Sequence, residues 1–115
     1  MPKLNVKSVV DQLSALAQEH RLALFRLLVQ AGPSGLAAGA IVDAMGVPAS
    51  SLSFHLAHME RSGIIARERR GRSLLYSADF AAMGALVGYL TENCCGGALC
   101  VPTTQCISEE RRNVA

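Results

Sequence analysis

The sequence predicts one mainly α-helical domain that carries a small β-hairpin. Apolar residues recur at helical spacing up to Gly63 and again after Asp79. Between these two positions the pattern is that of short strands. The 115 residues, half of them apolar, suffice for a single hydrophobic core. We therefore expect about five helices and a two-stranded hairpin within residues 1–93, followed by a cysteine-containing tail over residues 94–115.

Two helices are expected before residue 32. Steps of four, three and four residues define one apolar face of the first helix, formed by Val6, Val10, Leu13 and Ala17. Ser8 or Asp11 is expected near its start. The second helix is expected over residues 19–31, with a buried side formed by Leu24, Phe25, Leu27 and Leu28. Gly32 and Pro33 end it, since glycine suits a left-handed helix end and proline cannot continue a helix.

Two shorter helices with a tight joint follow. The segment "AAGAIVDAM" predicts an amphipathic helix whose inward residues are Ile41, Ala44 and Met45. Gly46 permits a sharp turn, and Pro48 is tolerated in the first turn of the next helix, where its missing N–H would have no partner. That helix is expected from about Pro48 to Arg61, with an inward stripe formed by Leu52, Leu56 and Met59. Two helices joined by a short glycine-containing turn are typical of a helix-turn-helix.

A hairpin and a last helix complete the domain. "IIARERR" and "SLLYSA" predict two strands that are joined around Gly71, and a hairpin directly after a helix-turn-helix is a wing. Asp79 is a good N-cap for a final helix. The apolar stripe of that helix comprises Phe80, Met83, Val87 and Leu90, and it is widened by Leu86 and Tyr89. This stripe is wider than one thin domain can cover.

Positive charge is concentrated in one short segment. The whole chain carries a net charge of +2, but between residues 61 and 72 five arginines face a single acid, Glu68, which leaves +4 there and about −2 elsewhere. The five are Arg61, Arg67, Arg69, Arg70 and Arg72. A compact basic patch on a mildly acidic body suggests a polyanionic partner, although a solvated arginine-rich hairpin is the plainer alternative.

The helix "PASSLSFHLAHMER" indicates which kind of polyanion the partner is. With Leu52 pointing inward, the outward face comprises Ser50, Phe54, Ala57 and Arg61, flanked by Ser51 and His58. An exposed Phe54 is expected to contact a thymine methyl group or a sugar in a DNA major groove; the alternatives are a partner protein or an ordinary exposed aromatic residue. The residues expected to contact double-stranded DNA are Ser50, Ser51, Ser53, Phe54, His55, His58, Arg61, Arg70 and Arg72.

Two of these residues have open alternatives. His55 lies nearer the buried side of the helix, so a structural hydrogen bond competes with a phosphate contact. Ser53 is compatible with either role. Arg70 and Arg72 at the hairpin tip have the reach to enter a minor groove or to hold the DNA backbone.

All four cysteines fall between Cys94 and Cys106, in and after "TENCCGGALC". If the last helix ends at Asn93, the two following glycines can reverse the chain and return Cys100 to Cys94 and Cys95. Three thiolates on one side suit arsenite or antimonite, As(III) or Sb(III). A four-thiolate zinc or cadmium site that includes Cys106, or a thiol redox switch, remains an alternative, although the chain has no Cys-x-x-Cys motif.

Several classes of protein are disfavoured. The apolar runs are too short to cross a bilayer, and the start of the chain lacks a secretory pattern, so we expect a cytoplasmic protein with reduced thiols and no membrane partner. No phosphate-binding loop or nucleophile beside a basic residue is present. We therefore expect no enzyme, no organic cofactor and no small organic substrate.

These elements together resemble the arsenic-repressor (ArsR/SmtB-type) family of bacterial winged-helix regulators. The similarity lies in "EHRLALFRLL", in "GLAAGAIVDAMGVPASSLSFHLAHMERSGII" and in the wing "RERRGRSLLYSA", which together span most of the chain. "SSLSFHL" with "SGII" is the more specific part of this signature. The resemblance implies a homodimer built on the first and last helices, and such a dimer would explain the wide apolar stripe of the last helix.

The resemblance also bears on the inducer. The family's familiar arsenite site, a Cys-x-Cys pair before the recognition helix, is absent from "AAGAIVDAM", and the last helix "DFAAMGALVGYLTEN" has no histidine for the family's zinc site. "ENCCGG" with a downstream cysteine resembles the branch that holds arsenite at the end of the last helix. This match implies Cys94, Cys95 and Cys100 as ligands, with Cys106 as an alternative or a fourth. The expected protein is a repressor that leaves its operator when As(III) binds.

Overall fold

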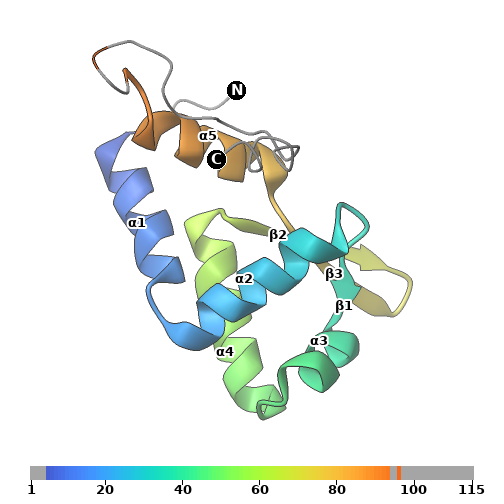
Figure 1. Ribbon diagram of the computed structural model, residues 1–115. Coiled ribbons are helices and arrows are strands. Elements are labelled where there is room, and N and C mark those ends of the chain that lie inside the picture. Colours follow the sequence, from blue (N-terminus) through green and yellow to red (C-terminus); the bar gives the residue numbers. More distant parts are fainter. Residues whose placement is uncertain (1–4, 94–95, 97–115) are drawn as a thin grey trace, which may run out of the picture.

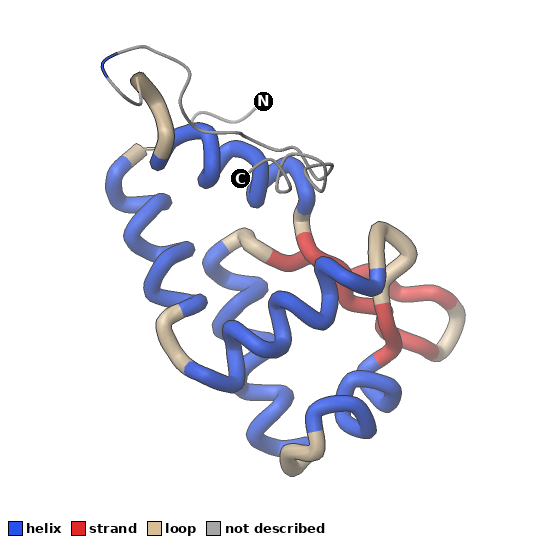
Figure 2. Tube along the Cα trace, viewed as in Figure 1, coloured by secondary structure: helices blue, strands red, loops and turns tan. Residues whose placement is uncertain are grey.

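Five helices make up most of the molecule, and a small sheet lies at one side of it (Figures 1 and 2). The computed structural model describes residues 5–93 and residue 96. In chain order the elements are α1 (Val6–Leu16), α2 (Glu19–Ala31), β1 (Leu36–Ala37), α3 (Ala38–Met45), α4 (Ala49–Ser62), β2 (Ile65–Arg70), β3 (Ser73–Ala78) and α5 (Phe80–Leu90). The predicted mainly α winged helix-turn-helix is confirmed. None of the described helices is both long and apolar enough to span a membrane.

The sheet has one strand more than the sequence predicts. Its order is β1-β3-β2, and both pairings are antiparallel. The predicted hairpin is present, with Ile65 opposite Ala78 and Arg70 opposite Ser73. The additional strand β1 pairs Leu36 with Tyr76 and Ala37 with Leu75. A two-residue strand has no periodicity to detect, and only its pairing with a distant segment defines it.

The core lies between α2, α4 and the sheet. Its fully buried large side chains are Leu24, Leu28, Ile41, Leu52, Met59 and Ile64. The inward stripes predicted for the helices at 19–31 and 48–61 are confirmed, although Leu27 is only partly buried. In α3 the prediction is wrong at one position. Ala44 is exposed, and Val42 packs against the core in its place, which covers the larger of the two apolar side chains.

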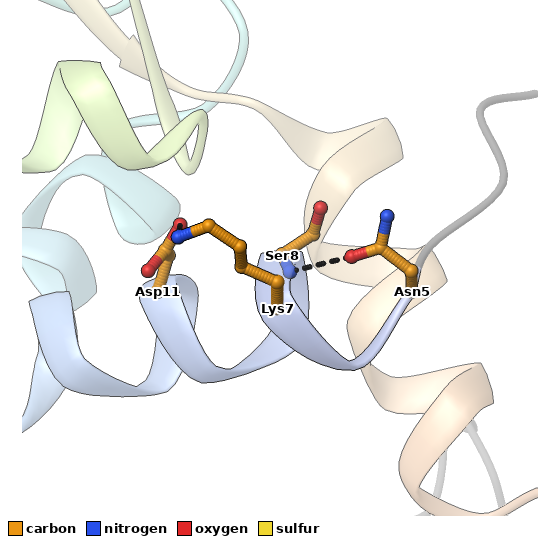
Figure 3. A network of polar contacts seen from close by, with 4 residues as sticks. All are labelled: Asn5, Lys7, Ser8 and Asp11. Carbon is orange, nitrogen blue, oxygen red and sulfur yellow. Dashed lines mark hydrogen bonds and ion pairs between the residues drawn. The ribbon is translucent and has the colours of Figure 1, made fainter.

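The face of α1 that packs inward differs from the predicted apolar face. Val9, Gln12 and Ala15 are buried, whereas Val6, Val10 and Leu13 are exposed, and Ala17 follows the end of the helix. Ser8 lies in the first turn as expected, but the N-cap is Asn5, whose side-chain oxygen accepts a hydrogen bond from the Ser8 backbone N–H at 2.8 Å (Figure 3). Lys7 and Asp11 form an exposed ion pair at 3.8 Å. The exposed apolar face is thus left for another surface to cover.

The last helix begins as predicted. The Asp79 carboxylate accepts a hydrogen bond from the backbone N–H of Ala82 at 2.9 Å, and the Asp79 backbone N–H donates to the Ile64 carbonyl at 3.0 Å. Leu86 is buried, and Phe80 and Met83 pack partly against the core. The helix ends at Leu90, three residues earlier than the predicted Asn93. Val87, Tyr89 and Leu90 are exposed on its second half.

Removal of the Asp79 cap tests how firmly α5 is anchored. We expect Asp79→Ala to lower the free energy of unfolding by about 1 kcal/mol, because the Ala82 N–H loses its acceptor. Asp79→Asn keeps a side-chain oxygen at the same place and is the matched control. Urea denaturation followed by circular dichroism measures both, and equal loss in the two variants would contradict this account.

Gly35 is a position where the fold requires glycine. Its φ is +72°, and a Cβ there would collide with the backbone carbonyl of Tyr76. We expect Gly35→Ala to cost about 2 kcal/mol or more, from backbone strain together with separation of β1 from β3. Gly46→Ala is the control, since Gly46 has nearly the same positive φ (+69°) but open space around it. Thermal unfolding should show clearly the larger loss in Gly35→Ala.

Candidate nucleic-acid interface

The helix-turn-helix is formed by α3, a three-residue turn and α4. Gly46 adopts the left-handed conformation (φ 69°) and ends α3, and Pro48 stands at the N-cap of α4 with an extended ψ of 144°. Gly63, also left-handed, ends α4. Short turns at both ends fix the direction of α4, which packs on α1 and α2.

The predicted outward face of α4 is confirmed as a surface. Its exposed residues are Ser50, Ser51, Ser53, Phe54, Ala57 and Arg61. Phe54 is 64% exposed, which is high for a large aromatic side chain and identifies this face as one that a partner can cover. His58 is partly buried at the flank of the face, and His55 is partly buried nearer the core, as expected.

The arginine-rich segment is exposed but partly neutralised by its own acids. Arg67 lies 3.4 Å from Glu60 of α4, and Arg70 lies 3.2 Å from Glu68 within the same strand. Within residues 5–93, no acidic partner lies within ion-pair distance of the other three arginines of the segment, Arg61, Arg69 and Arg72. Exposed pairs contribute little to stability and exchange readily for a phosphate partner. The surface thus keeps its positive character from α4 to the hairpin tip.

Sequence reasoning missed one neighbour of α4. His20, in the first turn of α2, lies against His55, with 5.8 Å between the ring centroids. His55 is in turn 6.0 Å from the ring of Phe54, in an edge-to-face arrangement. Nothing in the local sequence links His20 to the recognition helix, because the contact depends on how α2 crosses α4.

Burial and neighbouring positive charges both lower the pKa of His55 and of His58. Burial lowers the pKa of His55, and the positive charges of Arg21 and the neighbouring imidazoles lower it further. Burial likewise lowers the pKa of His58, with additional contributions from Arg21 and Arg61. The Nδ1 atom of His55 is buried and has no hydrogen-bond partner among the described residues. Both imidazoles are therefore held mainly neutral near pH 7.

Arg21 is fixed in place beside the histidines. Its Nε donates to the Ala15 carbonyl at 2.7 Å, and its backbone N–H donates to the side-chain oxygen of Gln18, the N-cap of α2, at 3.1 Å. These bonds join the end of α1 to the start of α2. Because the guanidinium is held by backbone, its charge is a constant feature of this surface.

Two polar hollows lie behind α4, next to α1. The smaller, of about 240 Å³, is lined by Asp11, Ser14, His58, Arg61 and Ser62. The larger, of about 390 Å³, extends to the start of α5 and includes Gln12. Gln12 is 5% exposed, and its Oε1 accepts no hydrogen bond from the described residues. Arg61 borders both hollows as well as the outward face of α4.

The predicted inducer ligands lie outside the described residues. This applies to Cys94, Cys95, Cys100 and Cys106, so their arrangement stays a prediction. Within residues 5–93, no group of three His, Cys, Asp or Glu side chains is arranged to hold a metal ion. Between α5 and Cys94, Thr91 caps the helix end and Asn93 adopts a left-handed conformation (φ 56°).

Comparison with known proteins agrees with this architecture. A family model described as a helix-turn-helix domain matches residues 16–68, which include α2, α3 and α4. The chain is 32% identical over 92 residues to the HTH-type transcriptional regulator YgaV of Escherichia coli K12, a match that covers 78% of this chain and 93% of the relative.

Solved structures show the same fold. The transcriptional repressor BigR from Xylella fastidiosa is 26% identical, with a TM-score of 0.59 over 77% of this chain and 88% of the other. RHA00566, an ArsR family transcriptional regulator, has a TM-score of 0.65 over 80% of this chain and 92% of the other; at 21% identity it supports the fold alone. The relatives are regulators of transcription and not enzymes. The chain therefore belongs to the winged helix-turn-helix family of transcriptional regulators.

Proposed function

We propose that this regulator is a repressor that binds operator DNA as a homodimer and leaves it when As(III) is captured by the cysteines after α5. The observation that carries the DNA-binding part is the outward face of α4. A 64% exposed phenylalanine and an arginine without an acidic partner among the described residues share one helix face that lacks acidic side chains. Burial of such a face in a DNA groove is more favourable than its exposure to water.

In this proposal α4 enters the major groove. Pro48 provides no side-chain cap, so the first backbone N–H groups of α4 are open to a phosphate, together with Ser50 and Ser51. Phe54 then reaches base edges, where a thymine methyl group is its natural contact. The hairpin arginines Arg70 and Arg72 reach the backbone or the minor groove beside it.

The homodimer is supported by apolar surface that one chain leaves uncovered. The exposed apolar side chains of the two helices are Val6, Val10 and Leu13 of α1 and Val87, Tyr89 and Leu90 of α5. Among the described elements, α5 has no extensive contact with any other helix or strand. A second copy would cover both surfaces and place two α4 helices about one DNA turn apart, as a palindromic site requires.

Substitutions on the two parts of the surface should have different effects. We expect Arg72→Gln to weaken binding to all DNA duplexes, since one phosphate contact is lost in each protomer. The slope of log K against the logarithm of the salt concentration should fall in magnitude by about one for each altered protomer. Phe54→Ala should instead cost about 1–3 kcal/mol on the operator with little change in the salt slope. Fluorescence anisotropy over a range of salt concentrations measures both effects.

Arg26→Gln is the matched control, because Arg26 is an exposed arginine of α2 outside the arginine-rich segment. Its binding curve should match that of the unaltered protein. If Arg26→Gln and Arg72→Gln reduce the salt slope equally, the charge of the whole protein, and not the wing, governs DNA binding.

The inducer response is proposed from the cysteine pattern. Cys94 and Cys95 come shortly after the end of α5, and Cys100 and Cys106 follow within the next eleven residues. Three thiolates suit As(III) or Sb(III). The start of α5 is tied to the end of α4 through the Asp79–Ile64 hydrogen bond, so a shift of α5 alters the position of the DNA-reading helix. A coupling of about 3–5 kcal/mol per dimer would empty the operator.

Serine substitution tests this ligand set. We expect Cys94→Ser and Cys95→Ser to bind DNA normally but to stay bound when arsenite is added, because serine cannot replace a thiolate ligand. Cys100→Ser and Cys106→Ser, compared side by side, identify the third sulfur. Normal release from Cys94→Ser and Cys95→Ser would rule out the proposed ligands.

Two alternatives use the same cysteines. A four-thiolate site would respond to Zn(II) or Cd(II), and a redox switch would respond to peroxide. Titration of the DNA complex with As(III), Sb(III), Zn(II) and Cd(II) under strong reductant, and separately with peroxide, distinguishes the three. Release by zinc alone would exclude the metalloid proposal.

A further inference from the structure

The three histidines of the chain gather at the seam between the start of α2 and the recognition helix α4. The rings of His20 and His55 are 5.8 Å apart, and Phe54 continues the row toward solvent at 6.0 Å. His58 lies one turn along α4 and is close enough for its charge to affect His55. His20 is exposed, so the row begins and ends at the protein surface.

The charges around this row favour an anion. Arg21 from α2 and Arg61 from α4 are the cations beside the histidines. The acids in the neighbourhood are Glu19, next to His20 in the chain, and Asp11 of α1, which borders the hollow behind His58. Glu60 of α4 is held by Arg67. Asp11 is likewise paired with Lys7, at 3.8 Å. Among the described residues this leaves Glu19 against the guanidinium groups of Arg21 and Arg61, a balance that favours an anion over a metal cation.

The position of the row suggests which anion it meets. A helix seated in a major groove is flanked on both sides by the sugar–phosphate backbone. The hairpin meets one flank of α4, where Arg67 lies 3.4 Å from Glu60. His55 and His58 lie between the outward face and the buried stripe of α4, on the flank next to α2. His20 extends that flank onto α2.

We propose that the DNA-binding surface continues from α4 onto the first turn of α2, where His20, together with His55 and His58, contacts a backbone phosphate, and that the bound phosphate draws a proton from solvent onto His55 or His58. This inference rests on the proposed function, DNA binding. It adds a residue outside the recognition helix and the wing, and it makes affinity depend on pH.

The direction of the pH effect follows from the charges. In the free protein, burial and Arg21 lower the pKa of His55 and of His58 from 6.5, so acid pH favours the unfolded chain from about pH 6.5 downward. A bound phosphate has the opposite effect, since its negative charge raises the pKa of a nearby imidazole. Acidification therefore weakens the free fold but tightens the DNA complex.

Binding to duplex DNA at constant ionic strength tests the proposal. The probe is a fluorescein-labelled random-sequence duplex at low salt, because a phosphate contact requires no particular sequence. We expect the unaltered protein to bind roughly three- to tenfold more tightly at about pH 6 than at about pH 8, where one proton taken up changes affinity by at most tenfold per pH unit. His20→Gln, which removes the α2 imidazole beside the phosphate, should lose much of this dependence, with its largest loss of affinity at about pH 6.

Arg72→Gln is the control for a phosphate contact without titration. It should weaken binding at every pH and leave the pH dependence unchanged. His55→Gln provides a second variant, and circular dichroism at both pH values checks that each variant is folded. Affinity of the unaltered protein that does not change with pH, or a full pH response in both His20→Gln and His55→Gln, would overturn the proposal. Absence of duplex binding at any pH would instead overturn the proposed function itself.

Discussion

The burial of one narrow stripe of α4 is the contact on which the rest of the structure depends. Leu52, Leu56 and Met59 are buried against α1, α2 and the sheet, so α4 can adopt only one rotation about its axis. That rotation sets Phe54 and Arg61 outward and turns His55 toward α2. A rotation by one residue position would bury a serine or a histidine and expose a core leucine, which would cost several kcal/mol.

The same stripe connects the DNA-reading face to the helices that a second copy would cover. α4 packs directly on α1. Asp79, the residue after β3, donates its backbone N–H to the carbonyl of Ile64 near the end of α4, and its side chain caps the start of α5. α1 and α5 both carry exposed apolar side chains. A change at α5 therefore has a short route, through backbone hydrogen bonds and packed side chains, to the orientation of α4. Under the proposed function, this continuity would carry a change at an inducer site after α5 to the helix that contacts DNA.

The proposed DNA-binding surface carries two kinds of basic side chain, arginines on the hairpin and histidines between α2 and α4. The hairpin offers arginines that are charged at every physiological pH, two of which are already paired with glutamates. The α2–α4 seam offers imidazoles held mainly neutral by burial and by Arg21. In the proposed DNA complex the arginines would give a salt-dependent affinity, and the histidines would add a dependence on pH.

Several elements of this molecule follow from short stretches of its sequence. Helical periodicity predicted the buried stripes of α2 and α4, and the change of period after Gly63 predicted the hairpin. The residue type of Asp79 predicted that it caps the start of α5. All three are local properties of a few neighbouring residues. The packing of distant segments, in contrast, sets which face of α1 is buried, pairs Leu36 with Tyr76 and brings His20 beside His55. Periodicity shows that a helix has an apolar face but not whether its own core or another surface covers that face. Contacts between distant segments depend on how the helices cross, and no local pattern encodes that crossing.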